Sequence, residues 1–186
     1  ALAACGDDPV LLFANPRVRE FYPRYGFAAV DEAIFVADFD AVPAASMAAA
    51  LDPESAATRT LIHQLADEGI ASTEIFGARG HGHTLTWYLA NGFAAPPRQL
   101  DDHTLVVCHV EGDCLHINDI LARERFDLAA AIPRLIDRPI RHIRFGFTPE
   151  LWWPQARVAG VDPDPHLFVR GLAPNAPHKF PLLAQT

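Results

Sequence analysis

The segment at residues 79–84 carries residue types that could bind a phosphate group. It reads Arg-Gly-His-Gly-His-Thr and precedes a short apolar segment, residues 84–91, that is predicted to form a helix. Free backbone N–H groups at a helix N-terminus, with an arginine beside them, suit an anion. The same residues also suit an ordinary glycine-rich connection in which Thr84 caps the helix. We favour this second interpretation, because short motifs often arise by chance.

Two further groups of residues could ligate a metal ion. His81 and His83 are separated by one residue, and an Asp-Asp-His triplet follows at residues 101–103. A zinc site needs three or four converging ligands, and the sequence identifies no third ligand for the two histidines. Solvated loop residues are therefore the favoured interpretation.

His109, His116 and Asp119 fall on two segments, residues 104–110 and 114–121, which have the pattern of a strand pair joined by a turn. His116 lies between two apolar residues, so its side chain is expected on the opposite face from theirs. Asp119 is expected to cap a turn or to bind a backbone amide.

Composition restricts the classes of partner. The chain has 186 residues, of which 50% are hydrophobic, and this is enough for one core or two small ones. Its net charge of −8 disfavours nonspecific nucleic-acid binding, which needs a basic surface. A local basic set, interpreted as a solvated helix and loop, comprises Arg134, Arg138, Arg141 and Arg144. No apolar run reaches the roughly 18 residues of a membrane span, so no membrane partner is expected.

The three cysteines indicate a reducing compartment. Cys5, Cys108 and Cys114 show no C-x-x-C spacing, and an odd number leaves one unpaired. The sequence therefore predicts free thiols in a cytoplasmic protein. Cys108 and Cys114 flank the predicted turn and could face each other, but a disulfide between them is disfavoured.

The first elements are short and clearly delimited. Residues 10–14 form an apolar run typical of a buried strand. Asn15 has the residue type of a helix N-cap, and Gly26 is predicted to end that helix. Pro23 lies in its last turn and should kink or shorten it. Residues 27–38 are predicted to form one or two strands.

An alanine-rich linker is predicted at residues 41–51, followed by a helix that begins at residues 52–55. A later helix is capped by Asp127, and further strands are predicted at residues 140–147 and 166–170. The pattern favours an α/β (α+β) fold, with a mixed, mostly antiparallel twisted sheet and flanking helices.

Two stretches of the first part of the chain resemble the closing part of the GNAT superfamily of N-acetyltransferases. They are Leu-Leu-Phe-Ala-Asn at residues 11–15 and Phe-Tyr-Pro-Arg-Tyr-Gly-Phe at residues 21–27. In that superfamily a strand precedes a helix with a Phe-Tyr-x-x-x-Gly-Phe signature, and the last strands follow. The resemblance implies that residues 1–45 are the C-terminal end of a GNAT core.

A weaker resemblance covers the remainder, residues 46–186, and implies a GNAT-like C-terminal domain. It is to the C-terminal extension of a subgroup of two-part GNAT proteins. The residues that carry it are 115–120, 145–149 and 180–186.

The resemblance implies acetyl-CoA as the cofactor and transfer of its acetyl group to the amine of a small molecule or peptide. It implies that Tyr22 acts as a general acid and protonates the leaving coenzyme A thiolate. The residues implied to lie beside the cofactor are Phe13, Ala14, Asn15 and Arg19. Their strand would form one wall of the V-shaped cleft that holds the pantetheine arm.

The chain also departs from the superfamily. The pyrophosphate loop, Gln/Arg-x-x-Gly-x-Gly/Ala, should precede Val10, and only nine residues do so. The chain is therefore expected to be the C-terminal portion of an N-acetyltransferase that lacks the usual N-terminal cofactor-binding half. The alternative is a non-catalytic interaction or regulatory module with the same fold. Missing strands would expose a sheet edge, which favours association between copies of the chain.

Overall fold

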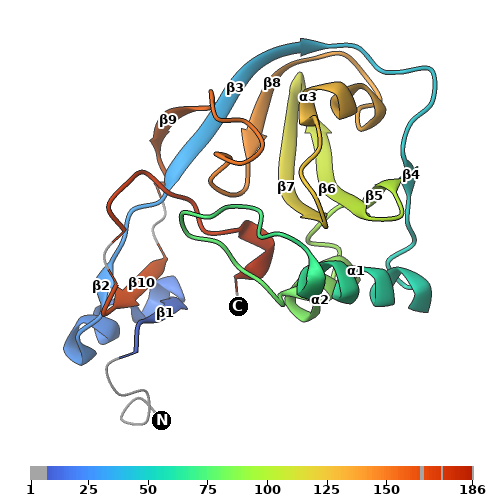
Figure 1. The fold of residues 1–186 in the computed structure, drawn as a ribbon. Coiled ribbons are helices and arrows are strands. Elements are labelled where there is room, and N and C mark those ends of the chain that lie inside the picture. Colours follow the sequence, from blue (N-terminus) through green and yellow to red (C-terminus); the bar gives the residue numbers. More distant parts are fainter. Residues whose placement is uncertain (1–7, 164–165, 173, 186) are drawn as a thin grey trace.

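The fold is that of a computed structural model, which describes residues 8–163, 166–172 and 174–185. Its strands form a seven-stranded and a three-stranded sheet (Figure 1). The larger sheet has, in spatial order, β4 (Ala49–Ala50), β5 (Arg98–Asp101), β6 (Thr104–Glu111), β7 (Cys114–Ala122), β8 (Ile140–Phe145), β3 (Ala33–Ala41) and β9 (Arg157–Val161). The smaller sheet has the order β1 (Val10–Phe13), β10 (Leu167–Arg170) and β2 (Ala28–Ala29).

The helices are short. The α-helices are α1 (Ala56–Glu68), α2 (Gly82–Ala90) and α3 (Leu128–Ala131), and the 3-10 helices are η2 (Pro16–Tyr25), η3 (Ile132–Arg134) and η4 (Leu182–Ala184). None of the helices in the described ranges has the length and hydropathy of a membrane span.

The sequence-based fold class is confirmed. Within the described residues every strand pair is antiparallel except β7 and β8, which run parallel and are connected through α3 and η3. A parallel neighbour needs such a crossover, whereas antiparallel strands can be joined by a tight turn. The result is a mixed, mostly antiparallel sheet with helices beside it.

Each face of the seven-stranded sheet covers its own core. Side chains alternate along a strand, so Leu105 and Val107 point to one face while Val106 and Cys108 point to the other. The first pair packs beneath α1 and α2, with a helical stripe made of Ile62, Leu65, Leu85 and Leu89. The second pair packs beneath α3 and η3, whose predicted apolar positions, Leu128, Ile132, Leu135 and Ile136, are all buried.

The N-terminal strand and helix are present where the sequence places them, with two differences. The side chain of Asn15 accepts a hydrogen bond from the N–H of Arg17, and Gly26 ends the helix in the left-handed region at φ 79°. The helix is 3-10 throughout, with Pro23 inside it. The strand predicted to be buried, β1, is only partly buried, because it is four residues long and pairs on one side only.

Each sheet contains a strand from a distant part of the chain. β3, from the first 45 residues, lies between β8 and β9 in the large sheet, and β10, from near the C-terminus, is the central strand of the small sheet. Figure 1 shows β3 continuing from the small sheet at one end into the large sheet at the other. Each sheet therefore contains strands from both predicted segments.

The cysteines and the two adjacent tryptophans have the following environments. Cys108 is buried opposite Ile117, and both it and Cys114 are free thiols, while Cys5 lies outside the described residues. Trp152 and its neighbour Trp153 seal an edge of the core, and the indole N–H of Trp152 donates to the Ser72 carbonyl at 2.9 Å.

Candidate functional site

Tyr22, the residue that the resemblance identifies as a general acid, is half-buried in an aromatic cluster. Its ring centroid lies 5.4 Å from that of Phe168 on β10, 6.3 Å from that of Phe27 and 5.8 Å from that of Phe21. These rings and Ala14 form the small core between η2 and the three-stranded sheet. The phenyl part of Tyr22 therefore contributes to packing of that sheet.

The residues expected beside the cofactor have different environments. Asn15 is exposed and uses its Oδ1 atom to cap η2, whereas Ala14 is buried and donates its N–H to the His166 carbonyl. The ring of Phe13 lies 5.3 Å from that of Phe180, near the C-terminus. Arg19 is half-buried on η2. The structure thus brings these residues together on β1 and η2, and later segments of the chain cover Phe13 and Ala14.

The parallel strands β7 and β8 separate part way along β7, a feature that the sequence did not reveal. The two strands are in register from Cys114 opposite His142 to Ile117 opposite Phe145. Gly146 then donates its N–H to the Ile117 carbonyl at 2.8 Å, and beyond this point β7 continues without β8. In open α/β sheets, ligands commonly bind in the crevice outside the carboxyl ends of the strands.

The C-terminal segment, defined here as residues 178–185, fills the space beside β7. Leu182 donates its N–H to the Gly146 carbonyl at 2.8 Å, and the side chain of Leu183 is 1% exposed in the core beneath α1 and α2. The Tyr88 hydroxyl on α2 donates to the Gln185 carbonyl at 3.1 Å. The C-terminal segment therefore lies where β7 and β8 separate, and a cavity of about 330 Å³ lined by Asn118, Gly146 and Leu182 remains there.

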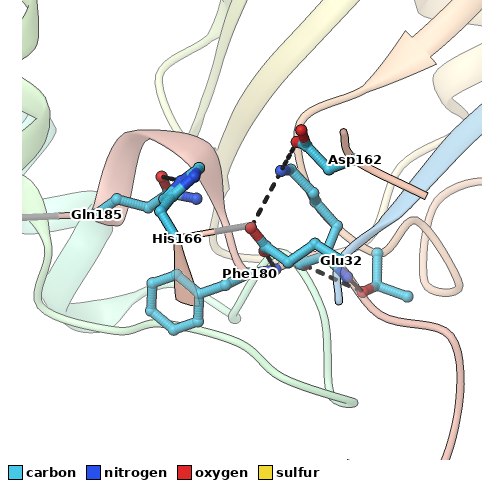
Figure 2. Close-up of polar contacts among 7 residues, drawn as sticks. Glu32, Asp162, His166, Phe180 and Gln185 are labelled. Carbon is cyan, nitrogen blue, oxygen red and sulfur yellow. Dashed lines mark hydrogen bonds and ion pairs between the residues drawn. The ribbon is translucent and has the colours of Figure 1, made fainter. Parts of the chain in front are cut away.

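Buried charges hold this segment in place (Figure 2). The ammonium of Lys179 lies 3.2 Å from a carboxylate oxygen of Glu32 and 3.1 Å from one of Asp162. The other oxygen of Glu32 accepts the N–H of Phe180 at 2.8 Å, and the side chain of Glu32 is fully buried. Such a charge must be paired and hydrogen-bonded inside a protein.

This network joins three distant parts of the chain. Glu32 precedes β3, Asp162 follows β9, and Lys179 is in the C-terminal segment. Figure 2 also shows His166 beside Gln185, whose side-chain oxygen lies 3.1 Å from the imidazole Nε2. Sequence reasoning did not identify the network, because nothing in local spacing relates Glu32 to Lys179.

The crossover after β7 lacks the features of a phosphate-binding loop. Residues 123–127 read Arg-Glu-Arg-Phe-Asp, with no glycine, and Asp127 caps a helix of only four residues. The carboxylate of Asp127 accepts the N–H of Ala130 at 3.1 Å, so this helix start already holds a negative charge. Arg123 pairs with Glu68 of α1, and Arg125 lies 3.8 Å from Glu74.

Residues 79–84 form a packed connection. Gly80 donates its N–H to the Ala66 carbonyl at 3.0 Å, and Gly82 lies against His63 so closely that a Cβ would be 2.9 Å from its Nδ1. The favoured interpretation of solvated loop residues is wrong for His81, which is only 9% exposed, and it agrees with the exposure of His83. The favoured interpretation of a connection agrees with this packing, although Thr84 is not the residue before the helix, which begins at Gly82.

His81 pairs with Asp119 on β7. Its Nε2 lies 2.7 Å from Oδ2 of the carboxylate, and Oδ1 accepts the Ile120 N–H at 2.9 Å, as the expectation of a bound backbone amide requires. Burial lowers the pKa of His81, but the charge and hydrogen bond of Asp119 outweigh it, and the pKa is raised from its ordinary value of 6.5. The other ring nitrogen, Nδ1, is buried without a hydrogen-bond partner among the described residues.

A polar cluster lies at the turn end of the β6–β7 hairpin. His109, Glu111 and His116 each have a ligand atom, and these atoms all lie within 4.8 Å of one another. Burial, His109 and Arg144 lower the pKa of His116, against a smaller opposite effect of Glu111. Both histidines line a cavity of about 330 Å³, to which Asn118 and Lys179 also contribute. The prediction that His116 faces away from Leu115 and Ile117 is confirmed, because those two residues are buried in the core.

The chain matches no family model and none of the curated proteins. Among solved structures it is similar to a GCN5-related N-acetyltransferase from Anabaena variabilis ATCC 29413, with 12% identity and a TM-score of 0.41 over 91% of this chain. It is also similar to one from Kribbella flavida, with 13% identity and a TM-score of 0.43 over 87%. The chain spans 48% and 43% of these two proteins, which is less than half of each.

Proposed function

We propose that this chain is a unit of a GNAT-like N-acetyltransferase, and that its own strand cleft is closed and does not bind acetyl-CoA. The observation that supports this is the hydrogen bond from Leu182 to Gly146 at the point where β7 and β8 separate. The resemblance places the pantetheine arm beside β1, and we infer that a cofactor bound to the larger sheet would instead enter where β7 and β8 separate. The C-terminal segment occupies that place and inserts Leu183 into the core.

The charge distribution supports the same conclusion. A coenzyme A bound between β7 and β8 would bring its pyrophosphate near the helix start after β7, a different place from the loop expected before Val10. Asp127 already holds that helix start in this chain, and its negative charge would repel a phosphate. The chain would then be a non-catalytic interaction or regulatory module, formed mainly by residues 46–186.

Amide hydrogen exchange on the full chain tests this function. The Leu182 amide should be protected nearly as well as the β6–β7 core. Acetyl-CoA at 1 mM, roughly the highest of typical KM values, should not change its exchange rate. Isothermal titration should detect no binding of acetyl-CoA. Saturable binding that accelerates exchange at Leu182 would show instead that the cofactor displaces the segment, and the proposal would be wrong.

A second candidate is acetyl transfer at the first part of the chain, residues 1–45, as the C-terminal end of a GNAT core. The strand, capped helix and left-handed Gly26 favour it. In this function Tyr22 is the general acid, and Phe13, Ala14, Asn15 and Arg19 contact acetyl-CoA. Further chain would have to supply the pyrophosphate loop and the pocket for the amine, in a cytoplasmic enzyme.

Tyr22→Phe separates the two candidates. In a longer protein with acetyltransferase activity, loss of a general acid should lower kcat by about 100-fold or more without changing KM. Phe21→Leu, which alters an adjacent and more exposed ring, is the matched control. An unchanged kcat in Tyr22→Phe would remove the catalytic role, and would leave the closed cleft of the larger sheet unaffected.

The small sheet is the proposed place of association. β1 and β2 are its outer strands, and their free edges can pair with a strand of another domain or another copy. Sedimentation at increasing protein concentration tests whether copies associate. A monomer at all concentrations would contradict pairing between copies.

A further inference from the structure

We propose that His109, Glu111 and His116 form a binding site for a divalent zinc ion. The three side chains belong to the β6–β7 hairpin, while the cavity that both histidines line is also bounded by Lys179 and Leu182 of the C-terminal segment. The proposal concerns the hairpin residues and does not require that the chain lacks acetyl-CoA binding.

The hairpin register brings the three side chains to one face. His109 on β6 is the direct partner of His116 on β7, and Glu111 follows His109 by two residues. Direct partners in antiparallel strands point to the same side with their Cβ atoms about 5 Å apart, and residues i and i+2 share a face. Two imidazoles and a carboxylate therefore project together from a single rigid element.

The distances are close to those of a metal site. His116 Nε2 lies 3.6 Å from Glu111 Oε2, and the two imidazole rings are stacked with centroids 4.8 Å apart and an interplanar angle of 19°. Ligands about 2.1 Å from a tetrahedral zinc ion are separated by about 3.4 Å. The ligand atoms lie within 4.8 Å of one another, and we infer that side-chain rotations bring all three to one ion.

Three protein ligands of this kind leave one coordination position open. His₂Glu sets hold zinc and retain a water or another small ligand in the fourth position. His109 and His116 line the cavity of about 330 Å³, so water or a small anion in it can complete the coordination. Asn118 and Arg144 line the same cavity and are able to hydrogen-bond such an anion.

Two neighbours modify the site. Cys114 is the direct partner of Glu111 and so lies on the same face, where its thiol is a possible competing ligand. Arg144 is the parallel partner of His116 on β8, and its positive charge opposes a bound cation. The effects of substituting Cys114 or Arg144 on Zn²⁺ binding should therefore distinguish this site from a chance pair of histidines.

Titration of the full chain with Zn²⁺, and with Co²⁺ as a spectroscopic probe, tests the site. We expect one ion per chain and visible Co²⁺ absorption of tetrahedral intensity. His109→Ala, His116→Ala and Glu111→Gln should each weaken Zn²⁺ binding by at least about tenfold, because even second-shell changes at metal sites have effects of that size. His142→Ala is the matched control, since His142 is exposed on β8 and lies 3.0 Å from the carboxylate of Asp38.

Two further variants sharpen the test. Arg144→Gln should strengthen Zn²⁺ binding, and Cys114→Ser should leave it within about twofold. Circular dichroism and thermal unfolding of each variant without metal verify that it is folded. The proposal is overturned if the wild-type chain binds no Zn²⁺, if His142→Ala weakens binding as much as His116→Ala, or if only Cys114→Ser abolishes it.

Discussion

The imidazole of His81 and the carboxylate of Asp119 form a buried pair, with Nε2 and Oδ2 2.7 Å apart and side-chain exposures of 8% and 0%. The pair fixes the start of α2 to β7 just beyond the point where β8 leaves it. Residues that are 38 positions apart are thus joined where the sheet has lost a strand partner. The interaction explains why a histidine in a glycine-rich connection is buried.

This pair predicts a pH dependence of stability. The folded-state pKa of His81 is raised above 6.5, so folding favours its protonated form. The resulting stabilisation is complete below pH 6.5, the unfolded value, and is lost as the pH rises through the folded pKa. The free energy of unfolding should therefore fall as the pH is raised from 6 toward 9, as measured by urea denaturation.

His81→Gln should remove this pH-dependent component and lower stability at pH 6. His103→Gln, at an exposed position in the β5–β6 turn, is the control and should keep the wild-type pH profile. An identical pH profile for His81→Gln and the wild-type chain would contradict the assignment.

Removal of the buried ammonium should strongly destabilise the fold. Lys179→Ala leaves the carboxylate of Glu32 buried without its cation, and breaking such a pair typically costs about 3–5 kcal/mol. Urea denaturation should show a much lower midpoint. Arg138→Ala, which removes an exposed pair with Asp137, should leave the midpoint unchanged. Equal midpoints for the two variants would argue against the anchoring role of Lys179.

Gly146 has little room for a side chain. A Cβ there would lie 3.0 Å from backbone atoms of Asn118 and 3.3 Å from Leu182. Gly146→Ala should therefore crowd β7 and the C-terminal segment, and we expect a cost of about 1–3 kcal/mol. Amide exchange at Leu182 should accelerate.

Gly160→Ala is the control for this substitution, because a Cβ at Gly160 on β9 would meet nothing within 4 Å. Its stability should equal that of the wild-type chain or exceed it slightly, since alanine in a strand loses less backbone entropy than glycine. If Gly146→Ala were as stable as Gly160→Ala, the close approach at the strand separation would be refuted.

The described cysteines should differ in reactivity. Burial raises the pKa of the Cys108 thiol to about 12, and burial also raises the pKa of the half-buried Cys114 thiol, against the nearby charge of Arg144. Because the thiolate is the reactive species, Cys108 should resist iodoacetamide at pH 8 until the chain unfolds. Peptide mapping should find slow labelling at Cys114 first. Faster labelling of Cys108 in the folded chain would contradict its burial.

Local sequence determined the elements of this protein. Asn15 and Gly26 delimit η2, apolar spacing sets the buried stripes of α1 and α2, and alternation identifies the β6–β7 hairpin. These features depend on residues within one or two turns of each other, and such interactions are the ones a sequence pattern records. The strand face on which His116 lies could be predicted for the same reason.

Tertiary structure alone decided which distant residues meet. The pairings of Glu32 with Lys179 and of His81 with Asp119, and the entry of residues 178–185 beside β7, depend on the path of the chain between sheets. No local spacing encodes them, because buried charges and strand edges are satisfied by whatever segment the topology brings there. The amino-acid sequence by itself therefore determined the capped helix of residues 16–25, the β6–β7 hairpin and the buried stripes, while only the folded chain decided that residues 178–185 lie where β7 and β8 separate.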